Sequence, residues 1–429
     1  MTASSRRIVI TGIGLISPLG LSLDAFWTAL CQGRSGIRRI RSFDASGLPV
    51  QIAGEIDRFD AKLYLDKKDR KSLKVMARPI QLAIATAQLA LDQGAVDKSQ
   101  LDPERFGVEF GASLIASELA ELGVASQLSA NCQPAIVDLD KWGEQSLPSM
   151  PPLWMLKYLP NMLACHVSIL HNAQGPNNTI TEANAAGLLA LGEAYRIIAR
   201  DQADIFLVGG ADSKVNPLSL ARQCLFEPLS RRNEAPEQAS RPFDRRRDGT
   251  VLGEGGAVFV LEELEHARRR RARILAEVVG FAATFDRARS GAGIARAVRA
   301  ALTEAGVQPS NVDHVNANGT SDVDSDVAEA AGLREVFGDC RPPVPVFAAK
   351  SYFGNLEAGS GPVELAASLL ALEHGVLPRT LNYEEPDPAC PICVAAGEPC
   401  PVTRPYVLKV SFTDMGQCAA LIFRTSGMA

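Results

Sequence analysis

Residues 240–263 read SRPFDRRRDGTVLGEGGAVFVLEE, a charged segment that passes through glycines into an uninterrupted apolar run. Continuous runs of Val, Phe and Leu are typical of β-strands that are covered on both faces. Similar runs recur beside glycines along the chain, as RRIVITGIG, FGVEFGAS and DIFLVGGAD. Helical patterns such as PIQLAIATAQLALDQG and ANAAGLLALGEAYRIIARD lie between them. This alternation predicts an α/β fold.

The composition of the 429-residue chain is that of a globular protein, with 46% hydrophobic and 22% charged residues. Its length predicts two or three structural units. The formal net charge of -5 gives no general attraction to nucleic acid, so we expect none as a partner. An anionic protein partner would have to meet a local basic patch.

No stretch reaches the roughly 18 apolar residues that a membrane-spanning helix needs, and MTASSRRIVITGIG runs directly into a predicted strand. We therefore expect a cytoplasmic protein without a membrane span. The nine cysteines are scattered singly apart from Cys390, Cys393 and Cys400, a pattern that indicates reduced thiols. The PACPIC segment resembles half of a zinc site but has no second half, so we expect no metal and no cofactor.

The order of the elements predicts two halves of similar construction. After the basic helix end EHARRRRAR the pattern of strands and helices restarts with ILAEVVGF, which places a boundary near residue 270 between residues 1–270 and 271–429. The stretch of about 117–160 is irregular, polar and contains several prolines. We interpret it as a cap inserted into the first half.

Several segments carry a resemblance to a known family. IVITGIGLISPLG (8–20), LVGGADSKVNPL (207–218) and AAKSYFGNLEAGSGPVELAAS (348–368), together with residues 240–263, resemble the β-ketoacyl-acyl-carrier-protein synthases of the KAS II-like type. The resemblance implies a thiolase-type fold, in which two similar halves form a five-layer α/β/α/β/α sandwich, usually as a dimer. It also implies acyl and malonyl thioesters on the phosphopantetheine arm of an acyl carrier protein as substrates.

The resemblance further implies a catalytic centre of one cysteine and two histidines. The cysteine lies at a helix N-terminus and accepts the acyl group, and the histidines donate hydrogen bonds to a malonyl thioester carbonyl. The matching positions in this chain are Asn184, Asn318 and Asn355. An amide can still donate hydrogen bonds, but it is not a nucleophile. An acyl-enzyme at residue 184 is therefore not expected.

Five charged residues surround these motifs. By resemblance, Lys350 matches a family lysine, Glu364 a buried glutamate, and Asp326 the acid after the first histidine motif. We interpret these three as one internal charge network. Glu182 and Asp414 are departures from the family motifs that we expect in the pocket. With Lys350 they offer an alternative, acid–base chemistry in place of the usual mechanism.

Two basic segments, LDKKDRKSLK and HARRRRAR, are candidates for docking an acidic acyl carrier protein. The first lies near the docking surface that the resemblance implies, and solvated helix faces are the alternative for both. Their cationic residues are Lys67, Lys68, Arg70, Lys71, Lys74, Arg268, Arg269, Arg270, Arg271 and Arg273.

Three functions follow from these observations. The leading hypothesis is a divergent subunit that resembles chain length factors and pairs with an active ketosynthase, with the amide of Asn184 satisfying the N–H groups of the helix terminus. The first alternative is an acyl-thioester enzyme with altered chemistry at Lys350, Glu182 or Asp414. The second is a homodimer that binds acyl carrier protein without turnover.

Overall fold

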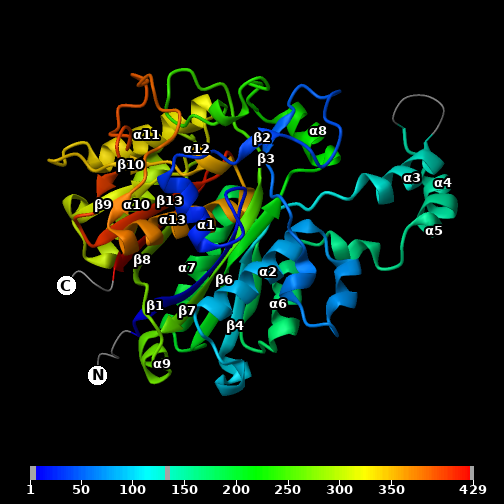
Figure 1. Ribbon diagram of the computed structural model, residues 1–429, viewed down its shortest axis with the longest axis horizontal. Helices are drawn as coiled ribbons and strands as arrows, with labels where there is room; N and C mark the ends of the chain where they lie inside the picture. The colour runs from blue at the N-terminus through cyan, green and yellow to red at the C-terminus, as the bar shows by residue number, and fades with distance from the viewer. Residues whose placement is uncertain (1–5, 131–135, 426–429) are drawn as a thin grey trace.

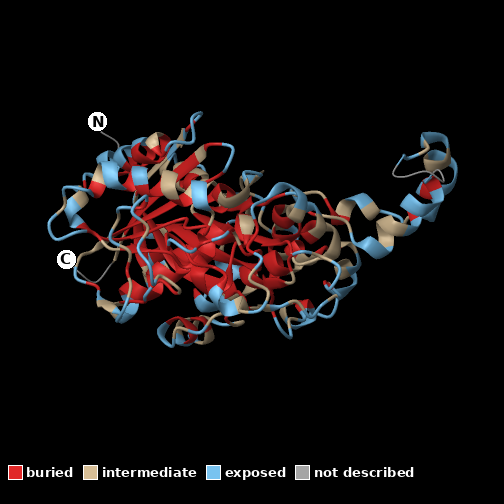
Figure 2. Ribbon diagram, turned by 90° about the horizontal axis from the view of Figure 1, so that it is seen from above, coloured by how far each residue is buried: buried red, intermediate tan, exposed pale blue. Residues whose placement is uncertain are grey.

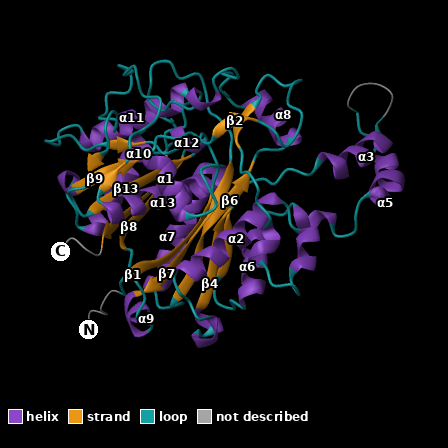
Figure 3. Ribbon diagram, viewed as in Figure 1, coloured by secondary structure: helices purple, strands orange, loops and turns teal. Residues whose placement is uncertain are grey.

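The computed structural model describes residues 6–130 and 136–425, and one continuous ten-stranded sheet runs through it (Figure 1, Figure 3). The expected cap at about 117–160 includes residues 131–135, which lie outside the described residues. The first half of the chain contributes five strands to the sheet: β1 (Ile8–Ile16), β4 (Phe106–Gly111), β5 (Asn177–Ile180), β6 (Ile205–Ser213) and β7 (Glu254–Glu263). The second half contributes β8 (Ala276–Phe285), β9 (Val312–Asn316), β10 (Val346–Phe347), β13 (Tyr406–Phe412) and β14 (Gln417–Thr425).

The strand order shows two halves joined at a seam. The sequence of neighbours is β10-β9-β13-β14-β8-β1-β7-β6-β4-β5, so the five strands of each half stay together. Only Ile8–Ile10 of β1 pair with β8, against nearly the whole of β1 with β7. At the far edge β4 pairs in parallel with both β5 and β6. The carboxyl ends of these three strands therefore meet at one place.

Helices form three layers around the two halves of the sheet. On the outer face of the first half lie α2 (Arg78–Gln93) and α6 (Met162–His171), on the outer face of the second half α10 (Ala292–Ala305) and α11 (Val323–Phe337), and between the halves α7 (Ala186–Ala199) and α13 (Ser360–His374). The continuous apolar runs of the strands are buried on both faces, as their composition predicts. The predicted α/β fold with two similar halves and five layers is confirmed.

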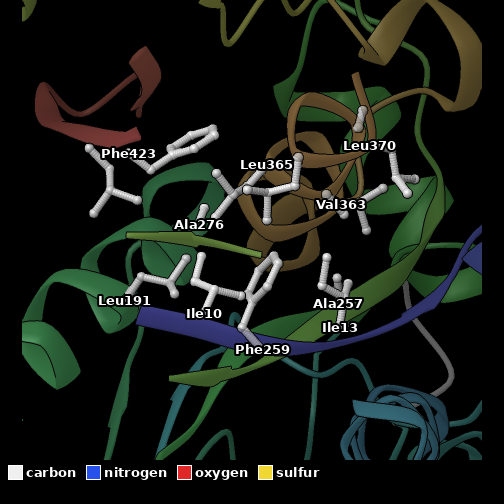
Figure 4. Packing of buried hydrophobic residues seen from close by; sticks show 14 of the residues in the cluster. Ile10, Ile13, Leu191, Ala257, Phe259, Ala276, Val363, Leu365, Leu370 and Phe423 are labelled. Atoms are coloured by element: carbon white, nitrogen blue, oxygen red, sulfur yellow. The ribbon is translucent and has the colours of Figure 1, made fainter. Parts of the chain in front are cut away.

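The central layer is packed closely. Figure 4 shows side chains from β1, β7, α7 and α13, among them Ile10, Phe259, Leu191 and Val363, meeting in one apolar cluster. Gly187 of α7 permits this approach, because a Cβ at that position would lie 2.5 Å from the ring of Pro362 in α13. The central helices therefore hold the start of α7 firmly against the second half.

An arm projects from the first half of the molecule (Figure 1, Figure 2). It contains α3 (Leu119–Ser129), α4 (Leu139–Lys141) and α5 (Leu147–Ser149), which contact one another more than the body. Figure 2 shows its residues to be mostly exposed or half-buried, in contrast to the buried centre of the sheet. Several of its large apolar side chains are exposed.

The other α-helices and strands are α1 (Leu23–Cys31), β2 (Ile37–Arg39), β3 (Ile52–Gly54), α8 (Pro217–Phe226), α9 (Leu264–Arg269), α12 (Lys350–Phe353), β11 (Val376–Leu377) and β12 (Cys400–Pro401). All four residues of α12 are buried. Among the described residues, none of the helices has the length and apolar character that crossing a membrane requires.

Candidate functional site

A cavity of about 1240 Å³ lies where the carboxyl ends of β4, β5 and β6 meet. This edge is where ligands bind in many α/β proteins. The cavity wall also includes α8 and the segments that follow β8, β9 and β13. Asn184, Asn318 and Asn355, which are far apart in the sequence, all line it.

Asn184 lies in the tight turn between β5 and α7. Ala183 before it has a φ of 41°, a left-handed conformation that is strained for a residue with a Cβ. The Oδ1 of Asn184 is buried and has no hydrogen-bond partner among the described residues. No side chain caps α7. The hypothesis that this amide satisfies the helix N–H groups is therefore wrong, and its Oδ1 stays unpaired among the described residues.

Asn318 follows β9 and is held on several sides. Its backbone N donates to Glu329 Oε1 at 2.7 Å, and its Oδ1 accepts from Lys350 Nζ at 3.0 Å. Its Nδ2 lies 3.4 Å from the carbonyl oxygen of Phe412. The amide is therefore oriented by its neighbours.

Asn355 follows α12 and Gly354, whose φ of 79° turns the chain sharply. Its Oδ1 accepts from Ser360 Oγ at 3.0 Å and from the backbone N of Glu357 at 3.2 Å. These two donors fix the orientation of the amide, so that Nδ2 is the atom left to meet a ligand. Asn355 is 6% exposed and lines the cavity, and its Nδ2 is a hydrogen-bond donor.

Behind Asn318 lies a buried charge network that does not line the cavity. Glu364 forms ion pairs with Lys350 Nζ and Lys409 Nζ, each at 2.6 Å, and all three side chains are at most 1% exposed. Lys409 also donates to the backbone carbonyls of residues 316, 317 and 410. Lys350 and Glu364 thus form the expected internal network. Lys350 reaches the cavity only through Asn318.

Asp326 belongs to a different cluster from the one expected. Its carboxylate accepts from the backbone N atoms of Phe243 at 2.8 Å and Thr320 at 3.0 Å, and Arg247 Nε lies 3.6 Å away. Burial raises the pKa of Asp326 to about 7. The residue fixes the loop after β9 and has no ion pair with Lys350.

The two new carboxylates of the sequence analysis separate in the structure. Asp414 lines the cavity, and its backbone oxygen accepts from Arg289 Nη1 at 3.3 Å. Glu182 is exposed, although its neighbours Thr181 and Ala183 line the cavity. The expectation of Glu182 in the pocket is therefore wrong, because this side chain is exposed to solvent and does not line the cavity.

Sequence reasoning missed a buried polar group beside Asn184. Lys214, directly after β6, donates to Ser113 Oγ at 2.5 Å and to the carbonyl of Leu114 at 2.7 Å, and lies 3.4 Å from Asp212 Oδ1. Ser113 in turn donates to Asp212. Lys214 and Ser113 line the cavity, but their mutual bonds already use their hydrogen-bonding groups. The apolar runs FGVEFGAS and DIFLVGGAD predicted two of these strands, but not the parallel pairing that brings their ends together.

Glu357 was missed as well. It lines the cavity, and burial raises its pKa to about 7, further aided by nearby Asp212, Glu227 and Asp414 and opposed by Lys214. Burial likewise raises the pKa of Glu227. The neighbouring acidic residues on this wall therefore favour the protonated form of both glutamates.

The charged lining is acidic overall among the described residues. Its cationic residues are Lys214, Arg222 and Arg289. Its acidic residues are Glu227, Asp286, Asp322, Asp324, Glu357 and Asp414. An anionic group entering the cavity meets more carboxylates than cations.

The two basic segments lie at different ends of the molecule. Lys67, Lys68, Arg70, Lys71 and Lys74 are exposed in and beside the short helix Arg70–Val75, which contacts the base of the arm. That base adjoins the cavity through residues 115 and 116.

The second segment is remote from the cavity. The helix α9 and the following arginines lie beside Ile205, at the opposite end of β6 from Lys214, roughly 30 Å away at 3.3 Å per residue (Figure 1). Arg270 is engaged with buried Glu262 and with the carbonyl of Gly94 at 2.8 Å. Arg268 pairs with Glu265 at 2.7 Å, and Arg269 borders a smaller cavity at that end.

Comparison with known proteins shows which family this chain belongs to. The family model Beta-ketoacyl synthase, N-terminal domain, matches residues 5–267, and the corresponding C-terminal domain matches residues 275–384. The 3-oxoacyl-(acyl-carrier-protein) synthase 2 of Synechocystis sp. is 34% identical over 425 residues, which cover 98% of each chain. The ketoacyl synthase alpha subunit of the tetracenomycin polyketide synthase of Streptomyces glaucescens is 36% identical over 393 residues, 90% of this chain and 89% of that protein.

A solved structure titled the ishigamide ketosynthase/chain length factor superposes with a TM-score of 0.86 at 30% identity. It covers 99% of this chain, and this chain covers 100% of it. Sequence relatives and solved structures thus span nearly every described element, including the strand ends that form the cavity. The chain belongs to the β-ketoacyl synthase family.

Proposed function

We propose that this chain is a non-condensing member of its family, a chain-length-factor-like subunit that pairs with an active ketosynthase in fatty acid or polyketide biosynthesis. The observation that carries the proposal is Asn184. The strand, strained turn and helix that would present a nucleophile to the cavity present a neutral amide instead. Condensation by the family's usual route requires a residue that accepts the acyl group, and an amide cannot do so.

The described lining of the cavity offers no ready replacement for that nucleophile. Cys418 is buried, and burial raises its pKa to about 11, so it stays a thiol at neutral pH. Ser113 is held between Asp212 and Lys214. No histidine occurs among the described residues of the wall. The acidic lining further opposes the carboxylate of a malonyl group.

The surfaces of the first half support a partner chain. β5 is an edge strand of the sheet, and Asn177 and Asn178 on it are exposed, so its free backbone groups are available for pairing. The projecting arm adds exposed apolar side chains such as Leu119, Leu139 and Leu147. A related ketosynthase provides the chemistry that this cavity lacks. The alternative occupant of these surfaces is a second copy of the chain. The experiment must distinguish this homodimer from a complex with a ketosynthase.

The first experiment measures both the stoichiometry of the complex and the formation of acyl adducts. The full chain, alone and mixed with an intact ketosynthase from the same genome, is analysed by size-exclusion chromatography with light scattering. Both samples are then incubated with acyl- and malonyl-carrier protein, and intact masses are recorded. We expect a one-to-one complex, an acyl adduct on the ketosynthase only, and unchanged masses for the chain alone and its malonyl carrier.

Each contrary outcome has a definite meaning. An acyl adduct on this chain, or loss of carbon dioxide from the malonyl carrier with the chain alone, would sink the non-condensing proposal. A stable homodimer that ignores the ketosynthase but binds carrier protein would replace the partner role by the carrier-binding one. The catalytically inactive cysteine-to-alanine variant of the ketosynthase is the control for adduct formation.

The exposed lysines near the base of the arm predict where a carrier protein docks. We expect the double variant K67E/K71E to weaken association with acyl carrier protein by roughly tenfold, because it reverses two charges facing an acidic partner. The loss should shrink at high salt. Binding is measured by fluorescence anisotropy of labelled carrier protein. The matched variant R268E/R269E, on α9, should change the affinity little. Equal weakening by both pairs would contradict a specific site beside the arm.

A further inference from the structure

Glu357 is a carboxyl group in the cavity that the proposed partner role leaves unused. It is half-buried, and its side chain makes no hydrogen bond or close ion pair to any described residue. Its backbone has a φ of 49°, a left-handed conformation that costs a residue with a Cβ energy to hold. The fold therefore maintains a free carboxyl group on the cavity wall at some cost.

Asn355 places a hydrogen-bond donor next to that carboxyl group. The backbone N of Glu357 donates to Asn355 Oδ1 at 3.2 Å, which ties the two residues together. The same bond, with that from Ser360 Oγ, occupies Oδ1 of this cavity-lining residue, and no described residue accepts a hydrogen bond from its Nδ2. A hydrogen-bond donor and a carboxyl group, both without a partner among the described residues, thus come from two linked residues of the cavity wall.

The groups facing Glu357 allow it to exchange protons near neutral pH. Lys214 and Asp212 at the end of β6, Glu227 at the end of α8, and Asp414 in the turn after β13 are its charged neighbours. Burial and the three acids raise the pKa of Glu357 to about 7, and Lys214 opposes them. Acid–base groups work best when both protonation states are populated.

We propose that Glu357 and Asn355 form an acid–base site that removes and returns an α-proton of an acyl thioester bound in the cavity. The α C–H bond breaks, its proton goes to the carboxylate of Glu357, and the electron pair moves onto the thioester oxygen. That oxyanion accepts a hydrogen bond from Asn355 Nδ2. Return of a solvent-exchanged proton restores the thioester, so no acyl-enzyme and no co-reactant are needed. The inference rests on the acyl-thioester class of the proposed function, but not on pairing with a ketosynthase.

The test is isotope exchange with butyryl-pantetheine as the probe. The full chain is incubated with the thioester in D₂O at several pD values, and deuterium at C2 is followed by mass spectrometry against a sample without protein. We expect incorporation of up to two deuterons, faster as pD rises through 7. E357Q should slow exchange by roughly 100-fold, the usual weight of a general base. E357D should retain part of the rate, and the surface variant E398Q all of it.

Two results would overturn the proposal: exchange no faster than in the sample without protein, or exchange that E357Q leaves intact. Thermal unfolding of E357Q checks that lost exchange is not lost fold. N355A should slow exchange without altering its pD dependence, since Asn355 does not titrate; an unchanged rate in N355A would exclude it from the site. Failure here leaves the mass experiment on condensation untouched. An acyl adduct there would likewise leave the exchange result standing.

Discussion

Replacing Glu364 by glutamine is expected to lower the free energy of unfolding by about 4 kcal/mol, because two buried ammonium groups lose the carboxylate that pairs directly with both. Lys350 and Lys409 both lie 2.6 Å from its carboxylate, and none of the three side chains is more than 1% exposed. Burial lowers the pKa of Lys409, and Glu364 is the main group that opposes this. Loss of the carboxylate would lower that pKa further. Lys409 can lose its proton in the variant, which limits the loss of stability. The neutral amine still satisfies the backbone carbonyls around it less well than an ammonium group does.

Urea unfolding followed by circular dichroism measures the change. The matched control is E335Q, which removes one half of the exposed pair with Arg299 and should cost less than about 1 kcal/mol. Should E364Q not fold, the double variant E364Q/K409M, with one cation removed as well, should recover soluble protein. A cost for E364Q as small as that of E335Q would show that the network contributes little. Strictly additive costs of E364Q and K409M would show that the two groups do not interact.

That network also shows how far the sequence could be interpreted. The apolar runs and helical periodicities predicted the α/β layers, because strands covered on both faces must be apolar throughout. Lys350 and Glu364 were recognised through the resemblance. Lys409 was not, because a lysine within the apolar strand sequence YVLKVSF gives no local sign of the carboxylate it meets. The acid comes from a helix 45 residues earlier in the chain, and only the packed fold brings them together.

The cavity could be predicted in outline but not in its charge. Asn184, Asn318 and Asn355 were located by motif and do line one wall. Glu182 was placed wrongly because a motif gives position along the chain but not the direction of a side chain, and here the residue is exposed beside the left-handed Ala183. Glu357 was overlooked for the related reason that its left-handed backbone is invisible in the letters. Side-chain direction at turns is set by dihedral angles that many residues can adopt.

The second large effect concerns Glu109, a carboxyl group buried in β4. It is 0% exposed, and neither carboxyl oxygen has a hydrogen-bond partner among the described residues. Burial, with a smaller contribution from Glu193, raises its pKa to about 8 from an ordinary value of 4.5. Its strand lies between β5 and β6, so its stability bears on the edge that presents Asn184 and that we propose for pairing.

The sign of the pH dependence follows from which state holds the proton. Between pH 4.5 and about 8 the unfolded chain has released the Glu109 proton while the folded chain retains it. The unfolded state then binds fewer protons, so this residue makes the free energy of unfolding fall as pH rises through that window. Below the window and above it the contribution is constant. The total loss is about 5 kcal/mol, taking roughly 1.4 kcal/mol per unit of pKa shift.

The variant E109Q isolates this contribution, because a neutral amide mimics the protonated carboxyl group at every pH. Wild type and E109Q should have similar stability at pH 5, and E109Q should be more stable by up to about 5 kcal/mol at pH 9. Urea unfolding at four pH values gives the two curves, and E398Q, which removes an exposed carboxylate, should follow wild type throughout. Comparing the slopes instead of the absolute values removes any packing difference between Glu and Gln. Parallel curves for wild type and E109Q would mean that Glu109 is already ionised in the folded protein, with a water or a cation reaching it through the exposed edge at β5.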